Sequence, residues 1–127
     1  MQNFTELRVW KQAYELTIAI HEVLERAPRT HGFAVMDQLR RAIVSVGANI
    51  AEGTRRETRR EYARFLNIAQ GSVAESDHLV RVAAGIGLLP KQKAAEFLHA
   101  LDRLGRGLSN LRDRVIRTNT ENPAPHV

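Results

Sequence analysis

The sequence predicts an all-α protein that folds as an antiparallel up-down-up-down four-helix bundle. Apolar residues recur three and four positions apart along most of the 127-residue chain, which is the period of an amphipathic α-helix. Aromatic residues are only 6% of the chain, and the β-branched runs between turns that mark all-β domains are missing. The four periodic segments are joined by short connections, which favour antiparallel neighbours. Apolar residues, at 43% of the sequence, suffice for a core between the helices.

The first helix is expected over residues 5–26. Asn3 or Thr5 can cap its start, because their side-chain oxygens can accept from free backbone N–H groups. Pro28 and Gly32 interrupt the period and end the segment. The residues predicted to face inward are Leu7, Trp10, Tyr14, Thr17, His21 and Leu24.

The second helix is expected over residues 33–52, with Gly53 as its C-terminal cap. Gly47 lies inside this helix, where glycine costs about 1 kcal/mol relative to alanine. We therefore expect Gly47 to allow a close helix crossing. The residues predicted to face inward are Met36, Leu39, Ile43, Val46 and Ile50.

The third helix is expected to begin at Thr58, because Thr58 and Glu61 have the spacing of a capping box. Gly85, Gly87 and Pro90 are expected to close it. One predicted face consists of Tyr62, Phe65, Ala69, Ser72, Ser76, Leu79 and Ala83, with Leu66, Val73 and Val80 beside it.

The fourth helix is expected over residues 91–117 and has the most regular apolar period in the chain. Gly105 and Gly107 lie inside it and indicate close packing. Residues 118–127 contain Asn, Thr and two Pro without a period, so we expect one domain over residues 1–117 and a disordered tail. The residues predicted to face inward are Ala94, Phe97, Leu101, Leu104, Leu108, Leu111 and Val115.

Further apolar residues lie outside the main stripes of the first and third helices. Extra apolar surface on a small domain indicates a partner surface, so we predict self-association. For any one of these residues, the alternative is a flanking position in the core. The residues are Ile18, Ile20 and Val23 in the first helix and Leu66, Val73 and Val80 in the third.

Polar residues follow a helical spacing on the second and third helices. Such groups near a helix seam can form a hydrogen-bond network that fixes the register of the helices. The alternatives are a ligand pocket and direct contacts across a subunit interface. Gly71 and Ser72 are small, which lets helices approach closely. The polar residues are Arg41, Ser45, Asn49 and Glu52, and then Gln70, Ser72, Glu75 and Ser76.

Two Glu-x-x-His pairs raise the possibility of a dimetal site, which uses such pairs on two helices. Glu96 and His99 fall on the outer face of the fourth helix, and Glu75 and His78 flank the seam of the third. We therefore expect no metal and no cofactor. No nucleophile elbow, phosphate loop or metalloprotease motif occurs, so we expect no catalytic residues and no enzymatic activity.

The chain contains no cysteine, which excludes disulfides and thiolate metal sites. No apolar run reaches the roughly 18 residues of a membrane span, and residues 1–10 do not read as a signal peptide. We expect a cytoplasmic protein with no membrane partner.

Basic residues are concentrated in two segments of a chain whose net charge is +5. Residues 54–60 hold four arginines against one glutamate, a net charge of +3, and residues 91–117 hold seven basic and three acidic residues, a net charge of +4. Arginine binds phosphate bidentately, and a clustered basic face is typical of nucleic-acid binding. The predicted nucleic-acid-binding residues are Arg55, Arg56, Arg59, Arg60, Arg103, Arg106 and Arg117.

The alternative for these arginines is a solvated face with local Glu–Arg pairs. Because few aromatic residues lie in the basic segments, base stacking is not predicted. Recognition should follow the backbone or shape of the nucleic acid and should depend strongly on salt.

Residues 38–75 resemble the family of 23S rRNA-intervening-sequence proteins. The most specific part runs Asn49-Ile50-Ala51-Glu52-Gly53, followed by Gly71-Ser72, and the opening Phe4-x-x-Leu7-x-Val9-Trp10 also matches. The resemblance covers residues 4–117, although Gly47-Ala48 stands where the family often has proline or another small residue. The motif positions are Arg41, Asn49, Glu52, Gly53, Gly71, Ser72 and Glu75.

The resemblance implies an antiparallel bundle that assembles into a ring-like homopentamer. It also implies a basic surface for RNA or another nucleic acid, and no enzymatic activity. A related branch of the family implies an alternative function, that of a protein-binding adaptor such as the accessory protein of a reverse transcriptase in a diversity-generating retroelement.

Overall fold

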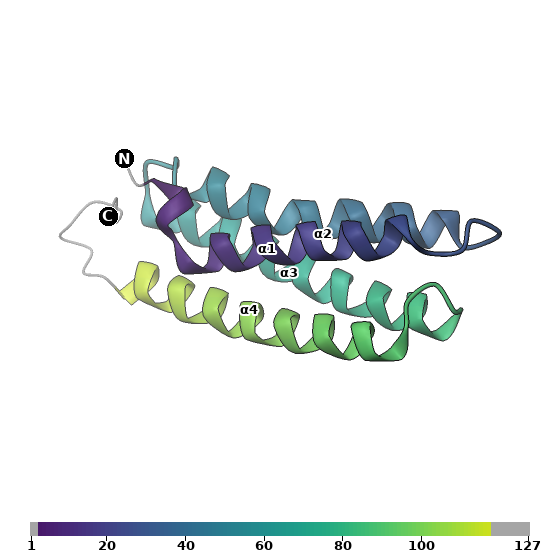
Figure 1. Ribbon diagram of the computed structural model, residues 1–127. Coiled ribbons are helices and arrows are strands. Elements are labelled where there is room, and N and C mark those ends of the chain that lie inside the picture. The colour runs from purple at the N-terminus through teal and green to yellow at the C-terminus, as the bar shows by residue number, and fades with distance from the viewer. Residues whose placement is uncertain (1–2, 118–127) are drawn as a thin grey trace.

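A computed structural model describes residues 3–117, which form a four-helix bundle (Figure 1). Each helix contacts its neighbours in the chain, and α4 also contacts α1, so the four helices enclose one core. Successive helices run antiparallel, as the short connections predict (Figure 1). The prediction of an all-α bundle is confirmed. The elements are a 3₁₀ turn η1 (Phe4–Glu6) and the helices α1 (Arg8–Glu25), α2 (Phe33–Gly53), α3 (Arg59–Gly85) and α4 (Lys91–Arg117).

The helix ends follow local chemistry that the sequence shows. Thr58 caps α3, and its Oγ1 accepts from the N–H of Glu61 at 3.1 Å. At the other end of α3, Gly87 has a φ of +84° and the N–H of Leu88 donates to the Ala83 carbonyl at 2.8 Å. This is a Schellman ending, and it places Leu88 in the core.

The start of the first helix differs from the prediction. Asn3 accepts from the N–H of Thr5 at 3.1 Å and so caps η1 rather than an α-helix. Leu7 is extended, with φ −71° and ψ 131°, and α1 begins only at Arg8. The predicted single helix is therefore a short turn followed by a helix.

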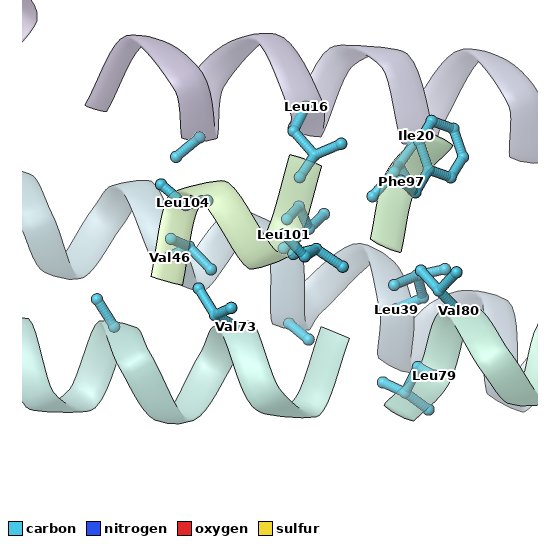
Figure 2. Close-up of a cluster of buried hydrophobic side chains, with 14 of the residues drawn as sticks. Leu16, Ile20, Leu39, Val46, Val73, Leu79, Val80, Phe97, Leu101 and Leu104 are labelled. Carbon is cyan, nitrogen blue, oxygen red and sulfur yellow. The ribbon is translucent and has the colours of Figure 1, made fainter. Parts of the chain in front are cut away.

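The core consists mainly of aliphatic side chains from all four helices, among them Leu16, Leu39, Leu79 and Leu101, and it includes the ring of Phe97 (Figure 2). Every residue predicted to face inward on α2 and α4 is buried. Full burial of one leucine-sized side chain stabilises the fold by about 1.5–3 kcal/mol, so these two regular stripes hold the bundle together.

The predicted inward face of the first helix is correct at Leu24, which is buried, but wrong for most of its length. Tyr14 is 53% exposed, and Trp10 and His21 are only half-buried. The helix carries two adjoining apolar stripes, and periodicity alone does not choose between them. The stripe that packs between α2 and α4 consists of Val9, Ala13, Leu16, Ile20 and Leu24.

The extra apolar residues belong mostly to the core. Leu66 and Val80 are fully buried, Ile20 is fully buried, and Val73 is 8% exposed. They therefore give no partner surface, and the alternative of flanking core positions is correct for them. Ile18 is the exception, at 45% exposure.

Three glycines have different surroundings. Gly53 is helical rather than a left-handed cap, and a Cβ there would lie 3.1 Å from the Tyr62 ring, so its role is close packing of α2 on α3. A Cβ on Gly107 would lie 2.8 Å from Val9 Cγ1, which confirms close packing there. Gly71 has nothing within 4 Å of a Cβ, so it serves no close approach among the described residues.

Candidate nucleic-acid interface

The connection from α2 to α3 and the last turns of α4 lie at the same end of the bundle, on the left in Figure 1. We call residues 54–64 together with residues 112–117 the basic end. These residues include three acidic side chains and eight arginines, a net charge of +5 that equals the charge of the whole chain. The arginines are Arg55, Arg56, Arg59, Arg60, Arg64, Arg112, Arg114 and Arg117.

A hydrogen bond joins the α4 part of the basic end to α3. Arg112 Nη1 donates to Asn67 Oδ1 on α3 at 3.1 Å, and within α4 Arg112 Nη2 donates to Asp113 Oδ1 at 3.2 Å. The side chain of Tyr62, at the start of α3, is buried, with 1% exposure. Burial raises the pKa of Tyr62 to about 12, and the nearby charge of Arg114 opposes that rise. The phenol is therefore neutral and adds no negative charge to this region.

A groove of about 520 Å³ opens at the basic end between the first turns of α3 and the last turn of α4. Ile116 projects into it and is 55% exposed. The lining residues are Arg59, Arg60, Glu61, Ala63, Arg64, Asn67 and Ile116.

Phe65 orders two of the arginines. The guanidinium carbon of Arg56 lies 5.3 Å from the centre of the Phe65 ring, and that of Arg64 lies 4.8 Å from it. Such cation–π contacts are worth about 0.5–1 kcal/mol at exposed sites. The apolar period predicts that Phe65 faces the core, but its ring is half-buried and packs against the guanidinium groups of Arg56 and Arg64.

The arginines of the basic end are only partly paired with acids. Arg56 lies 3.8 Å from Glu52, and Arg64 lies 3.2 Å from Glu61. Exposed pairs of this kind contribute about 0–1 kcal/mol, so a phosphate can compete for the arginine. Within the described residues, the side chains of Arg55, Arg60 and Arg117 have no ion pair or hydrogen bond, and all three are exposed.

Arg103 and Arg106 do not join the other predicted residues. Arg106 is eleven residues from Arg117, or about 16 Å along the helix axis, and it pairs with Asp102. Arg106 lies at a separate hollow between α3 and α4, which Asp77 also lines. The local surface there is mixed in charge rather than basic.

The sequence reasoning missed Arg64, Arg112 and Arg114. Arg112 and Arg114 lie in the basic segment 91–117, but they are not on the helix face that contains the predicted binding residues Arg103, Arg106 and Arg117. Arg64 is one turn beyond the run of arginines at 55–60, on the same first part of α3. Counting charge by helix end rather than by helix face would have found all three.

The polar motif residues on α2 and α3 are joined mainly to one another. The hydroxyls of Ser45 and Ser72 are 2.8 Å apart, and Asn49 Nδ2 donates to the Ser45 carbonyl at 2.9 Å. Gln70 Nε2 donates to Ser109 Oγ on α4 at 2.7 Å. These contacts agree with a structural network. The side chain of Glu52 pairs with Arg56, outside the network.

The remaining motif residues lie on the surface or in the core without such contacts. Arg41, Gly71 and Glu75 are exposed. Ser76 Oγ is buried and has no hydrogen-bond partner within residues 3–117. These positions therefore do not converge on one pocket.

The two Glu-x-x-His pairs do not form a centre. Glu75, His78, Glu96 and His99 are all exposed. Nowhere in the described part of the chain do three or more histidine and acidic side chains gather as metal ligands would. Nor does any helix described here combine the length and apolarity that crossing a membrane requires.

Comparisons with known proteins agree with this fold. The family model described as 23S rRNA-intervening sequence protein matches residues 5–110. A crystal structure of a protein of unknown function from the S23 ribosomal protein family of Bacteroides thetaiotaomicron superposes with a TM-score of 0.76 at 18% identity, over 82% of this chain and 97% of that chain. No curated protein matches the chain. Because the family model spans most of the bundle, the chain belongs to the family of 23S rRNA-intervening sequence proteins.

Proposed function

We propose that the protein is a non-enzymatic RNA-binding protein of the cytoplasm that grips the phosphate backbone of structured RNA with its basic end. One observation carries the proposal, namely that arginines from two segments far apart in the sequence gather at one end of the bundle with a net charge of +5. Clustered arginine is the surface that nucleic-acid backbones select.

The arginines divide into two groups with different tasks. Arg55, Arg60 and Arg117 are exposed and have no partners in the described structure, so their guanidinium groups are ready to bind phosphate oxygens bidentately. Arg56 and Arg64 are held on Phe65 and by glutamates. The side chains of the first group can adjust to the positions of phosphates along an irregular RNA backbone. Those of the second group offer positive charge at fixed positions.

Charge reversal tests this proposal. The double variant Arg55→Glu/Arg60→Glu should lose RNA binding by at least an order of magnitude, because each lost phosphate contact also loses its released counterions. The matched control is Arg103→Glu/Arg106→Glu, which changes the charge equally on the mid-part of α4 and should retain most of the binding. Equal losses from the two variants would show that only total charge matters.

We further propose that the protein is a homo-oligomer, specifically the homopentamer that its family resemblance implies. Tyr14, Ile18 and Val44 support self-association, because they are 53%, 45% and 48% exposed. The Thr17 hydroxyl, which donates to the Ala13 carbonyl at 2.7 Å, lies 3.4 Å from the Ile43 carbonyl, so these parts of α1 and α2 lie side by side. We call these three residues the apolar patch.

Light scattering tests the assembly directly. Five copies of the 14.3 kDa chain would have a mass of about 72 kDa and, at +5 each, a total charge of about +25, which would strengthen RNA binding further. A mass near 14.3 kDa would refute the oligomer. Ile18→Asp should lower the mass if the apolar patch is the interface.

A protein-binding adaptor is the second candidate, and the same apolar patch favours it. In that case the patch would contact a different protein rather than a second copy. Recovery of one protein by the wild-type chain after nuclease treatment, but not by Ile18→Asp, would favour the adaptor. RNA recovered in place of a protein would favour the first proposal.

A further inference from the structure

The groove at the basic end differs chemically from the charged surface around it. Its lining includes two apolar side chains, Ala63 and the 55% exposed Ile116, among arginines. A surface that bound phosphate alone would gain nothing from an exposed isoleucine. Apolar atoms next to charge suit a ligand that has a flat apolar part and an attached anion.

One wall of the groove is a guanidinium plane that is fixed in orientation. Arg64 Nε donates to Glu61 Oε2 at 3.2 Å, and Arg64 Nη2 donates to Glu61 Oε1 at 3.3 Å. The Phe65 ring supports the guanidinium at 4.8 Å. Arg64 nevertheless keeps 56% of its side chain exposed. A guanidinium that lies over an aromatic ring, is bound along one edge by a carboxylate and keeps more than half of its side chain exposed can stack on a nucleobase.

An amide in the same groove is also fixed. Asn67 Oδ1 accepts from Arg112 Nη1 at 3.1 Å, which orients the amide and leaves its Nδ2 group to donate. Within the described residues, Nδ2 donates to no acceptor. An acceptor on the edge of a base can therefore bind there. Arg59 and Arg60 line the same groove, and arginine is suited to binding the phosphates that flank a base.

We propose that this groove takes one unpaired nucleotide of the bound RNA, with its base stacked on Arg64 and packed on Ile116, and its edge bound by Asn67. The groove volume of about 520 Å³ lies within the roughly 300–1,000 Å³ of small-ligand sites. The inference rests on the proposed RNA binding and adds that bulged or looped RNA is preferred over duplex. It also revises the expectation that bases do not stack. The basic segments contain few aromatic residues, but the planar guanidinium of Arg64 supplies a stacking surface in their place.

The test compares two RNA hairpins of equal length and charge, one fully paired and one with a single bulged 2-aminopurine. The wild-type protein should bind the bulged hairpin about tenfold more tightly, which is the size of one base–side chain stack. Stacking should also quench the fluorescence of the 2-aminopurine. Arg64→Lys keeps the charge but removes the plane, so it should lose both the preference and the quenching and keep its affinity for the paired hairpin.

Two further variants sharpen the result. Ile116→Ser should reduce the preference without changing the charge, and Arg103→Lys, the matched control on the mid-part of α4, should keep both the preference and the quenching. Equal binding of the two hairpins by the wild-type protein would overturn the base site and leave the backbone contact standing. An absence of binding to either hairpin would overturn both proposals. A full preference in Arg64→Lys would remove Arg64 from the site.

Discussion

Gly71 and Gly107 show how much the surroundings decide at the scale of single residues. Both lie inside long helices, where sequence reasoning gives glycine the same meaning. A Cβ on Gly107 would lie 2.8 Å from the buried Val9, whereas a Cβ on Gly71 would meet nothing within 4 Å. The sequence therefore indicates that both are unusual, but only the structure shows which one the packing requires.

The two glycines should respond oppositely to alanine. Gly107→Ala should lower the free energy of unfolding by about 1–3 kcal/mol, because the methyl group overpacks the contact between α1 and α4. Gly71→Ala should raise it by up to about 1 kcal/mol, the helix propensity gained at an open position. Urea unfolding of both variants measures this pair, and a large loss in Gly71→Ala would place a second subunit against that surface.

Tyr62 should make the protein sensitive to alkali. Its pKa is raised to about 12 in the folded protein from an ordinary 10, so its contribution is complete below pH 10 and is lost as the pH rises from 10 to 12. The free energy of unfolding should fall in this range by up to about 1.4 kcal/mol per pH unit from this one group. Tyr62→Phe should remove that part of the slope, and equal slopes in the two proteins would contradict the raised pKa.

At the scale of helices, the inward face was predicted correctly for helices with one apolar stripe and incorrectly for the helix with two. The bounds of α4 were predicted, and those of α2 to within one residue, and every residue predicted to face inward on them is buried, because each helix has one apolar stripe. The inward face of α1 was not predicted. Trp10 and Tyr14 lie on one apolar stripe and Leu16 and Ile20 on another, and the shape of the facing helices decides which stripe is buried. The N-terminal end of α3 was predicted from the capping box.

The cap of α3 should carry measurable energy at the base of the basic end. Thr58→Ala should lower the free energy of unfolding by about 1 kcal/mol, because the Glu61 N–H loses its acceptor. Thr58→Ser keeps the hydroxyl and serves as the control, with little expected change in urea unfolding. A loss of the same size in Thr58→Ser would mean that the threonine methyl group, not the cap, is responsible.

At the scale of the whole molecule, the site depends on how distant segments meet. Arg55, Arg60 and Arg117 were identified from local charge, but their convergence follows from the antiparallel run of α3 and α4. The groove and the Arg64 plane were not predicted, because Phe65 fits a core position by periodicity and its partner Arg56 comes from the preceding connection. The period of the apolar residues shows which side chains can be buried, but contacts between distant segments decide which groups those side chains pack against.

The central claim is that the basic end binds the RNA backbone through several arginine–phosphate contacts, and the salt dependence of affinity tests it most directly. The logarithm of the affinity should fall linearly with the logarithm of salt between about 50 and 200 mM, with a slope of about −0.7 to −0.9 per phosphate contacted. Arg60→Gln and Arg117→Gln should each reduce the steepness by about one contact, and Arg103→Gln should leave it unchanged. An affinity that does not change with salt, or no binding at low salt, would contradict the account.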